Sequence, residues 1–140
     1  MACHIRAMTL DDYDAAVELW QCTENLEMSV TDDRDSMRRF FDRNPGLSSV
    51  AFAGDKLIGT ILCSHDGRRG YLHHLAVDRR YRRKGIGCAL VDRSLSLLAK
   101  EGIVLCNIFI IEENDPGITF WQHNGFNFLE HFGWMQRKTF

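Results

Sequence analysis

The sequence has little of several features that mark common protein classes. It contains only 2 prolines among 140 residues and no repeated or biased tract, which excludes collagen and low-complexity disorder. No apolar run approaches the ~20 residues of a membrane-spanning helix. The first dozen residues turn acidic instead of forming the apolar core of a signal peptide. We therefore expect a single domain over residues 1–140, cytoplasmic and without a membrane partner.

Paired cysteines are also missing. The five cysteines are scattered, odd in number and without a CxxC spacing, so neither a disulfide framework nor a zinc site is indicated. The six histidines show no HxxxH spacing either, and we expect no metal. Reduced thiols agree with a cytoplasmic location.

Positive charge is scarce except in one place. The 17 Lys and Arg residues against 19 Asp and Glu residues give a net charge of −2. Five of these bases lie in residues 79–84 (RRYRRK), which leaves 12 bases against 19 acids elsewhere, a balance of −7. A nucleic-acid-binding protein usually spreads positive charge over a face. One compact basic spot suits a small anionic ligand better, and we expect no nucleic-acid partner.

Strand and helix patterns alternate along the chain. Short or alternating apolar stretches predict strands over residues 3–8, 49–53, 56–64 and 71–77, a central strand over 103–111, and a last strand or strand pair over 126–135. Helical spacing and capping signals predict helices over residues 10–22, 36–43, 85–101 and 115–123. This order predicts an α/β or α+β fold, a mixed sheet with helices on its faces.

The most informative segment joins a strand to the clearest helix. The basic turn after residues 72–77 ends in Arg82-Arg83-Lys84-Gly85-Ile86-Gly87, where the helix begins. The first N–H groups of a helix lack partners within it and carry partial positive charge. Glycine lets a phosphate approach the backbone. A solvated charge run is the alternative, but the position favours a cradle for a diphosphate.

Two common nucleotide-binding loops do not occur. No GxxxxGK[ST] sequence is present, which excludes a Walker loop. GxGxxG is absent as well, and the glycines lie in the middle of the chain, which argues against a Rossmann turn.

The segment resembles the [QR]xxGx[GA] signature of the GNAT superfamily of acetyl-CoA-dependent N-acetyltransferases, with Arg82, Gly85 and Gly87 at its fixed positions. Leu75-Ala76-Val77 is similar to the LxV strand end that precedes that signature. The order of predicted elements agrees over nearly the whole chain, and small stand-alone bacterial-type acetyltransferases are the most similar group. A second stretch resembles the C-terminal family pattern through Asn114, Phe120-Trp121 and Gly125-Phe126.

The resemblance implies a mixed, mostly antiparallel central sheet with splayed strands and helices on both faces. It also implies acetyl-CoA as cosubstrate, with the pantetheine arm between the splayed strands and the pyrophosphate on the helix start. A backbone N–H near Leu75 or Ala76 would polarise the thioester carbonyl. The cofactor-binding residues it implies are Leu75, Ala76, Val77, Arg82, Arg83, Lys84, Gly85, Ile86, Gly87, Cys88 and Asn114.

The acid and base positions depart from the family's pattern. Where many members carry a Tyr as general acid, this chain has Trp121, whose indole N–H can donate a hydrogen bond but does not give up its proton. His73 stands where many relatives carry a basic Glu, and it is the candidate base, with a packed structural histidine as the alternative. Strand alternation places His73 on one face with Leu75, and His74 on the other.

The resemblance therefore implies an N-acetyltransferase that moves an acetyl group from acetyl-CoA to a primary amine of a small molecule or peptide, by direct attack in a ternary complex. Glu112 and Glu113 are alternative bases, and an acetyl-cysteine on Cys88 is a minor alternative route. Residues 24–35 carry a local charge of −4. This acidity either attracts a cationic amine or makes a soluble face.

Two rival functions remain at this stage. A catalytically weak acyl-CoA-binding sensor with the same fold is kept open by Trp121. A nucleic-acid-binding protein that uses residues 79–84 is disfavoured by the negative remainder of the chain. The aromatic stretch over residues 128–140 predicts a sheet edge that pairs between subunits, and hence a homodimer.

Overall fold

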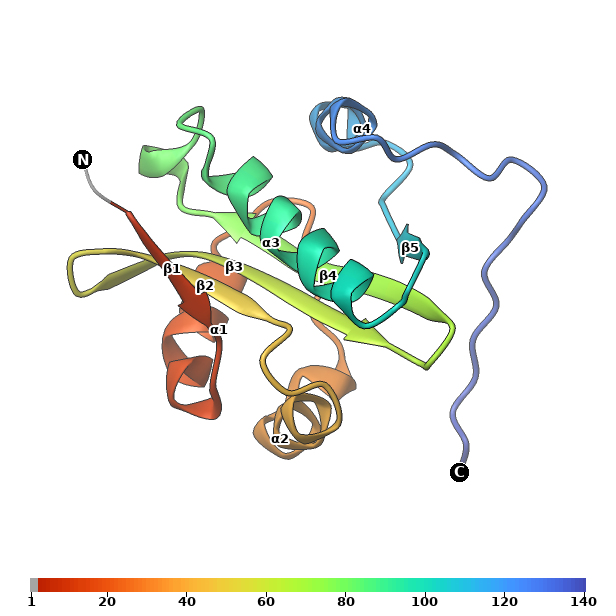
Figure 1. Cartoon of the computed structure of the whole chain (residues 1–140), viewed down its shortest axis with the longest axis horizontal. Coiled ribbons are helices and arrows are strands. Elements are labelled where there is room, and N and C mark those ends of the chain that lie inside the picture. Colours follow the sequence, from red (N-terminus) through yellow and green to blue (C-terminus); the bar gives the residue numbers. More distant parts are fainter. Residues whose placement is uncertain (1–2) are drawn as a thin grey trace.

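The computed structural model describes residues 3–140, whose strands form one mixed sheet in the order β1-β2-β3-β4-β5 (Figure 1). Neighbouring strands from β1 to β4 are antiparallel, and β5 runs parallel to β4. The expected mixed, mostly antiparallel sheet is therefore confirmed. The strands are β1 His4–Ala7, β2 Ser49–Ala53, β3 Lys56–His65, β4 Arg69–Val77 and β5 Leu105–Ile108.

Helices cover both faces of the sheet, as expected. On one face lie α1 (Tyr13–Gln21) and α2 (Arg34–Arg43), and on the other lies α3 (Ile86–Lys100) with α4 (Asp115–His123) beside it (Figure 1). Three short 3-10 turns complete the elements: η1 Leu10–Asp12, η2 Val30–Asp32 and η3 Arg79–Tyr81. None of the helices in residues 3–140 is long and apolar enough to cross a membrane.

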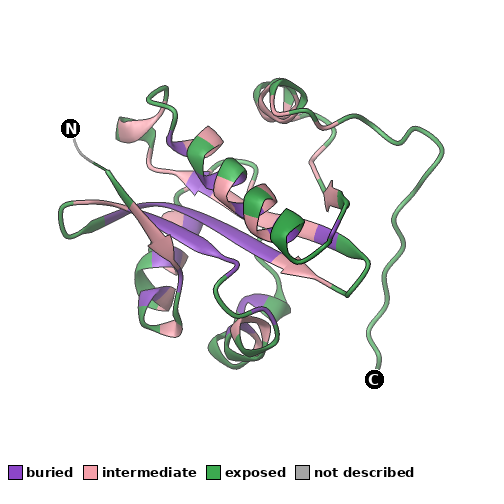
Figure 2. Ribbon diagram, viewed as in Figure 1, coloured by how far each residue is buried: buried purple, intermediate pink, exposed green. Residues whose placement is uncertain are grey.

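Each face of the sheet has its own apolar core. Trp20 of α1 and Met37 of α2 pack with Leu62 of β3 on one face. Leu90 and Leu98 of α3 pack with strand residues on the other. The alternation of strand side chains divides the apolar residues between these two cores, and Figure 2 shows the buried positions concentrated along β2, β3 and β4. The site described below lies where these strands leave the core.

The prediction that residues 103–111 form a central strand is wrong. β5 spans only Leu105–Ile108 and lies at the edge of the sheet. Val104 is 88% exposed and Leu105 is 58% exposed. A nearly unbroken apolar run predicts a strand buried on both sides, but here it marks a short edge strand whose outer side is open.

The prediction of a last strand or strand pair over residues 126–135 is also wrong. The chain after α4 runs without helix or strand and carries several exposed aromatic and aliphatic side chains, Phe128, Leu129, Phe132, Trp134, Met135 and Phe140. Figure 2 shows this segment exposed along most of its length, although the Trp134 ring stacks on Phe109. Residues 128–140, the predicted homodimer edge, therefore contain no strand.

Candidate active site

The two strands that frame the site separate part way along their length. The ladder between β4 and β5 runs from Arg69 paired with Leu105 to Leu72 paired with Ile108. β5 ends there, whereas β4 continues to Val77. The edge of β4 that faces β5 is therefore unpaired over residues 73–77. This is the splay that the sequence predicted.

A β-bulge lies at the point where β4 leaves β5. Leu62 of β3 pairs with His73, but Thr60 pairs with Ala76, so His74 and Leu75 together oppose one residue of β3. His74 has φ +49°, in the left-handed region that non-glycine residues rarely enter.

The bulge corrects the sequence-based placement of the two histidines. His73 is paired with Leu62, which belongs to the core under α1 and α2, and the ring of His74 contacts Trp20 of the same core. Both side chains therefore lie on the α1/α2 face. Strict alternation predicted opposite faces for them, and the extra residue of the bulge cancels that alternation.

His74 is held on three sides. The Thr60 hydroxyl donates a 2.9 Å hydrogen bond to the His74 carbonyl, and the Trp20 indole N–H donates to the same hydroxyl at 2.8 Å. The rings of Trp20 and His74 meet edge to face, with centroids 4.7 Å apart. The imidazole Nε2 lies 2.8 Å from the Asp32 carboxylate. These contacts stabilise a backbone conformation that is otherwise unfavourable.

Asp32 joins the segment before α2 to the sheet. Its side chain is 9% exposed and also accepts a 2.8 Å hydrogen bond from the Ser29 N–H. The Tyr13 hydroxyl donates to the Asp32 carbonyl at 2.6 Å. Burial by itself raises the pKa of the Asp32 carboxyl, but the hydrogen bonds from His74 and Ser29 outweigh it, so the net pKa is lowered. Asp32 is therefore an anion that faces His74.

His73, the candidate base predicted from sequence, lies in a row of aromatic rings. It stacks on Tyr71 with centroids 6.4 Å apart and on Phe109 at 6.1 Å. The Phe109 ring stacks in turn on Trp134 of the C-terminal segment at 4.4 Å. Burial lowers the pKa of His73, and neighbouring His74 lowers it further, against a smaller opposite effect of Asp32. His73 is therefore neutral near pH 7.

The predicted phosphate cradle lies at the start of α3. Gly85 adopts φ +80° just before the helix, and the first hydrogen bond inside the helix runs from Ala89 N to Gly85 O at 3.0 Å. The N–H groups of Ile86, Gly87 and Cys88 thus need partners from outside the helix. These N–H groups are the ones at which the sequence predicts a diphosphate, and that role stays a prediction.

Within the basic turn, the charges fall into two groups. The Arg82 Nε–H donates to the Val77 carbonyl at 2.9 Å, and its guanidinium pairs with Glu24. Arg79 pairs with the same carboxylate at 3.3 Å. Arg82 thus holds the turn against β4. Arg83 and Lys84 are exposed and have no carboxylate partner within residues 3–140.

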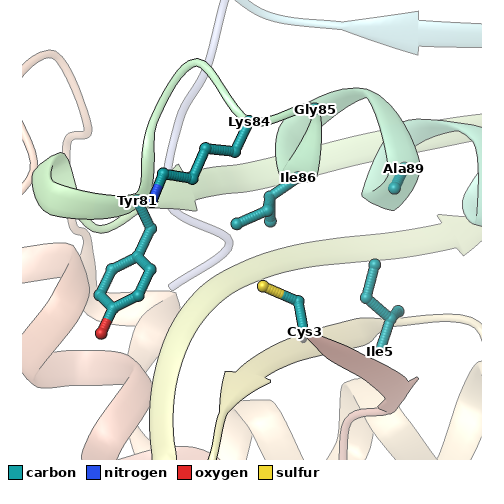
Figure 3. Close-up of a pocket in the computed structure, with 7 residues that line it drawn as sticks. All are labelled: Cys3, Ile5, Tyr81, Lys84, Gly85, Ile86 and Ala89. Atoms are coloured by element: carbon teal, nitrogen blue, oxygen red, sulfur yellow. The ribbon is translucent and has the colours of Figure 1, made fainter. Parts of the chain in front are cut away.

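Two pockets flank this turn, one on each side. The first, of about 270 Å³, lies between the start of α3 and β1, where Ile86 and Ala89 face Cys3 and Ile5 and Lys84 extends toward Tyr81 (Figure 3). The second, of about 230 Å³, lies between the end of α1 and the end of β4, and Val77 is one of the residues that line it. Both are shallow, and neither is lined by His73 or His74.

Other predicted residues are engaged in packing or capping. A Cβ on Gly87 would lie 3.2 Å from the Phe120 ring, so this glycine lets α4 pack closely on α3. The Cys88 sulfur accepts a weak 3.7 Å contact from Asn124. Asn114 caps α4 by accepting a 3.1 Å hydrogen bond from the Gly117 N–H. Trp121 packs edge to face between Phe120 and Phe126.

Sequence reasoning missed two residues of the site. Asp32 and Glu24 both come from the acidic stretch over residues 24–35, where nothing local separates them from their solvated neighbours. The only signal for them in the sequence is that residues 24–35 are acidic while residues 79–84 are basic. Glu112 and Glu113, the alternative bases, are exposed in the turn before α4, and their carboxylates form no hydrogen bond or ion pair within residues 3–140.

The profile of the acetyltransferase (GNAT) family matches residues 13–126. An acetyltransferase of Photorhabdus laumondii is 31% identical over 114 residues, which cover 81% of this chain and 79% of that protein. An acetyltransferase of Pectobacterium atrosepticum is 28% identical over 118 residues, covering 84% and 83% of the two chains.

Solved structures share the fold at lower sequence identity. Ard1 of Thermoplasma volcanium superposes with a TM-score of 0.80 at 23% identity, covering 91% of this chain and 84% of that one. The PaiA N-acetyltransferase of Thermoplasma acidophilum, in complex with coenzyme A, superposes with a TM-score of 0.77 at 23% identity and covers 91% of each chain.

Proposed function

Because this chain belongs to the GNAT family of acetyltransferases, we propose that it transfers the acetyl group of acetyl-CoA to a primary amine of a small molecule or peptide. The observation that carries this proposal is the open edge of β4 over residues 73–77, which leads directly into the exposed N–H groups at the start of α3. An unpaired strand edge followed by an anion site suits a ligand with an amide-rich arm and a diphosphate.

The residues present fit acetyl-CoA as cosubstrate. The N–H groups of residues 86–88 and the unpaired cations Arg83 and Lys84 would hold the pyrophosphate. The open edge of β4 would pair with the pantetheine amides, although the Val77 carbonyl already accepts from Arg82. Asn114 would contribute through its amide N–H₂ group, because its carbonyl oxygen is committed to the α4 cap. The complex of PaiA with coenzyme A supports this assignment.

In the proposed reaction, the amine nitrogen forms a bond to the acetyl carbon while the C–S bond breaks. Much of the acceleration would come from holding both reactants together in a ternary complex. A backbone N–H beside the bulge, at Leu75 or Ala76, would stabilise the oxyanion. The amine loses one proton, and the adjacent histidines of β4 are the nearest groups on the α1/α2 face that can accept it.

The leaving thiolate has no tyrosine acid at the position of Trp121. The indole of Trp121 is packed between two rings, so it shapes the site and does not supply a proton. A thiol has an ordinary pKa of about 8.5, so the thiolate can leave and take its proton from water.

The acceptor is an amine whose approach lies on the α1/α2 face. The acidity of residues 24–35 is largely used inside the protein, since Glu24 pairs with arginines, Asp32 with His74, and Asp33 caps α2. This argues against a strongly acidic acceptor rim. The solved NatC complex bound to a peptide and CoA, which shares this fold, supports a peptide amine as one class to test.

Thermal unfolding with and without acetyl-CoA tests the proposal. Acetyl-CoA at 100 times its dissociation constant is expected to raise Tm by roughly 5–10 °C, because ligation then stabilises the fold by about 2.7 kcal/mol. Arg83→Ala with Lys84→Ala should remove most of this shift. Arg68→Ala should leave it intact, because Arg68 is an exposed base in the turn between β3 and β4, away from α3's start.

Release of free CoA across a panel of amines and N-terminal peptides completes the test. Turnover with any of them supports an N-acetyltransferase. Binding of acetyl-CoA without turnover would instead identify the chain as an acyl-CoA sensor. Absence of any thermal protection would overturn both the cosubstrate and the enzyme assignment.

A further inference from the structure

At the bulge of β4, the two adjacent histidines differ in their partners, because only His74 is bonded to a carboxylate. His74 lies where β4 leaves β5, one residue beyond His73, and its imidazole is bonded to a nearly buried carboxylate. A histidine fixed by a carboxylate on one nitrogen can work as a base through the other. We propose that His74, oriented by Asp32, takes the proton from the acceptor amine, an inference that rests on the proposed function.

The hydrogen bonds define which nitrogen of His74 is available. The Asp32 carboxylate is ionised and only accepts hydrogen bonds, so Nε2 of His74 must carry the proton that lies between them at 2.8 Å. In the neutral imidazole, Nδ1 then has the free lone pair. Nδ1 has no hydrogen-bond partner within residues 3–140, and no fully buried polar side-chain atom of these residues lacks a partner. Nδ1 is therefore reached by solvent.

The backbone of His74 gives a second, independent reason. Its φ of +49° is a conformation that costs free energy for a residue with a side chain. The structure nonetheless fixes it with the Thr60 hydroxyl on its carbonyl and Trp20 against its ring. Such strain tends to be retained where it places a functional group. Here it turns the imidazole of His74 onto the same face as His73, toward the segment that carries Asp32.

His73 is less suited to this role. Its ring stacks on Tyr71 and Phe109, and no residue within 3–140 forms a hydrogen bond that would orient its nitrogens. The groups that face His74 are few. Asp32 from η2 and His73 from β4 are the titratable ones, while α1 and β3 present Trp20 and Thr60, which do not titrate in this range.

The proposed step is balanced. The amine lone pair forms the N–C bond, and the electrons of the C–S bond leave with sulfur. The amine proton passes to Nδ1 of His74, and the resulting imidazolium is stabilised by the Asp32 carboxylate. His74 then returns the proton to water, and the CoA thiolate takes one up.

The test compares pH profiles of kcat/KM for acetyl transfer to the best amine of the panel. His74→Asn is the main variant, because asparagine tolerates a positive φ. We expect it to lower kcat/KM by about 10²–10⁴-fold and to abolish the acidic limb of the profile. His65→Gln, at the far end of the β3–β4 hairpin, is the matched control and should retain wild-type activity. Each variant is first required to show the wild-type Tm shift with acetyl-CoA.

Asp32→Asn provides the second variant, with an ordinary backbone conformation. Loss of the carboxylate should lower kcat/KM by roughly 10–100-fold while leaving the Tm shift with acetyl-CoA unchanged, because the ring loses the partner that orients it and the imidazolium loses its counter-charge. A merely structural role for Asp32 would reduce the Tm shift with acetyl-CoA together with the activity. If His73→Asn abolishes the acidic limb while His74→Asn retains it, the assignment to His74 is wrong.

A chemical measurement separates this inference from the proposed function. Diethylpyrocarbonate reacts with an accessible, unprotonated imidazole nitrogen, and peptide mapping by mass spectrometry locates it. We expect His74 to be modified in the wild-type protein and acetyl-CoA to slow that modification at least threefold. An unmodified His74 overturns the inference even where turnover is observed. A wild-type protein that turns over no amine overturns the proposed function and the role of His74 with it.

Discussion

A single carboxylate, Glu24, determines how the basic turn is held. It pairs with both Arg82 and Arg79, and Arg82 also donates to the Val77 carbonyl. The hydrogen bond from Arg82 is the main reason that the pKa of Glu24 falls from 4.5 to about 2. The arginine at the first fixed position of the glycine signature therefore fastens the turn, and the free cations beside it are left for a ligand.

The depressed pKa of Glu24 predicts an acid-dependent contribution to stability. In the unfolded chain a glutamate titrates near pH 4.3. Since the folded pKa is lower, the contribution is fully present above about pH 4.3 and is lost as the pH falls toward 2. Glu24→Gln should lower the free energy of unfolding by less than about 1 kcal/mol at pH 6, because the pair is half-exposed. This difference from wild type should vanish near pH 2.

Urea unfolding at pH 6, 4 and 2.5 measures this contribution. Glu27→Gln is the control and should match wild type at each pH, because Glu27 is exposed and its carboxylate has no partner within residues 3–140. A difference between Glu24→Gln and wild type that stays constant down to pH 2.5 would show that the carboxylate's charge is not the cause.

At the scale of elements, the contact between α3 and α4 depends on the absence of a side chain at Gly87. A Cβ at Gly87 would lie 3.2 Å and 3.3 Å from two atoms of the Phe120 ring. The glycine was expected to let a phosphate approach, but its structural effect is to let α4 approach. The same helix carries Trp121, so this contact also fixes the position of Trp121 relative to α3.

Gly87→Ala is predicted to destabilise the protein by about 1 kcal/mol, because overpacking outweighs the better helix propensity of alanine. In a Phe120→Leu background the ring atoms are gone, and the same substitution should be neutral or stabilising. A double-mutant cycle by urea unfolding measures the coupling between the two positions, expected to be about 1 kcal/mol or more. Additive effects would show that the helices do not meet at Gly87.

The elements that sequence predicted well are those fixed by local signals. The spacing of apolar residues and the Gly85 and Gly102 boundaries placed α3 within a residue of its observed ends. The predictions of a central strand at β5 and of a strand after α4 were wrong, because an apolar stretch does not by itself indicate whether a neighbouring strand pairs with it. The bulge at His74 was missed for a related reason: register between β3 and β4 depends on the whole pair, not on either strand alone.

The site was predicted in the same uneven way. The sequence predicts a phosphate site at residues 82–87 because a helix start after a strand is a local pattern with a local chemistry. The pairing of His74 with Asp32 joins positions 42 residues apart, and only the folded chain brings them together. Sequence alone predicts His73 as the base, and it does not show that the bulge brings His74 onto the same face of the sheet.

Over the whole molecule, charge is segregated. The basic turn carries five of the 17 bases, and the rest of the chain has a balance of −7. Three of those five bases are paired with Glu24 or Asp78, which leaves Arg83 and Lys84 as the exposed cations of the turn within residues 3–140. A polyanion such as CoA is thus attracted at one place and repelled by most of the remaining surface.

This segregation predicts that CoA binding weakens with salt. Between 0.1 M and 1 M NaCl the Debye length falls from about 10 Å to about 3 Å, so an exposed contact between phosphates and Arg83 or Lys84 is largely screened. Calorimetry should show the affinity for CoA falling about five- to tenfold over this range. The affinity for pantetheine, which lacks the diphosphate, should change by less than about twofold.

Arg83→Ala with Lys84→Ala should bring the salt dependence of CoA binding close to that of pantetheine binding, because the remaining backbone N–H groups carry only partial charges. Equal salt dependence for CoA and pantetheine in the wild-type protein would place the diphosphate away from the start of α3.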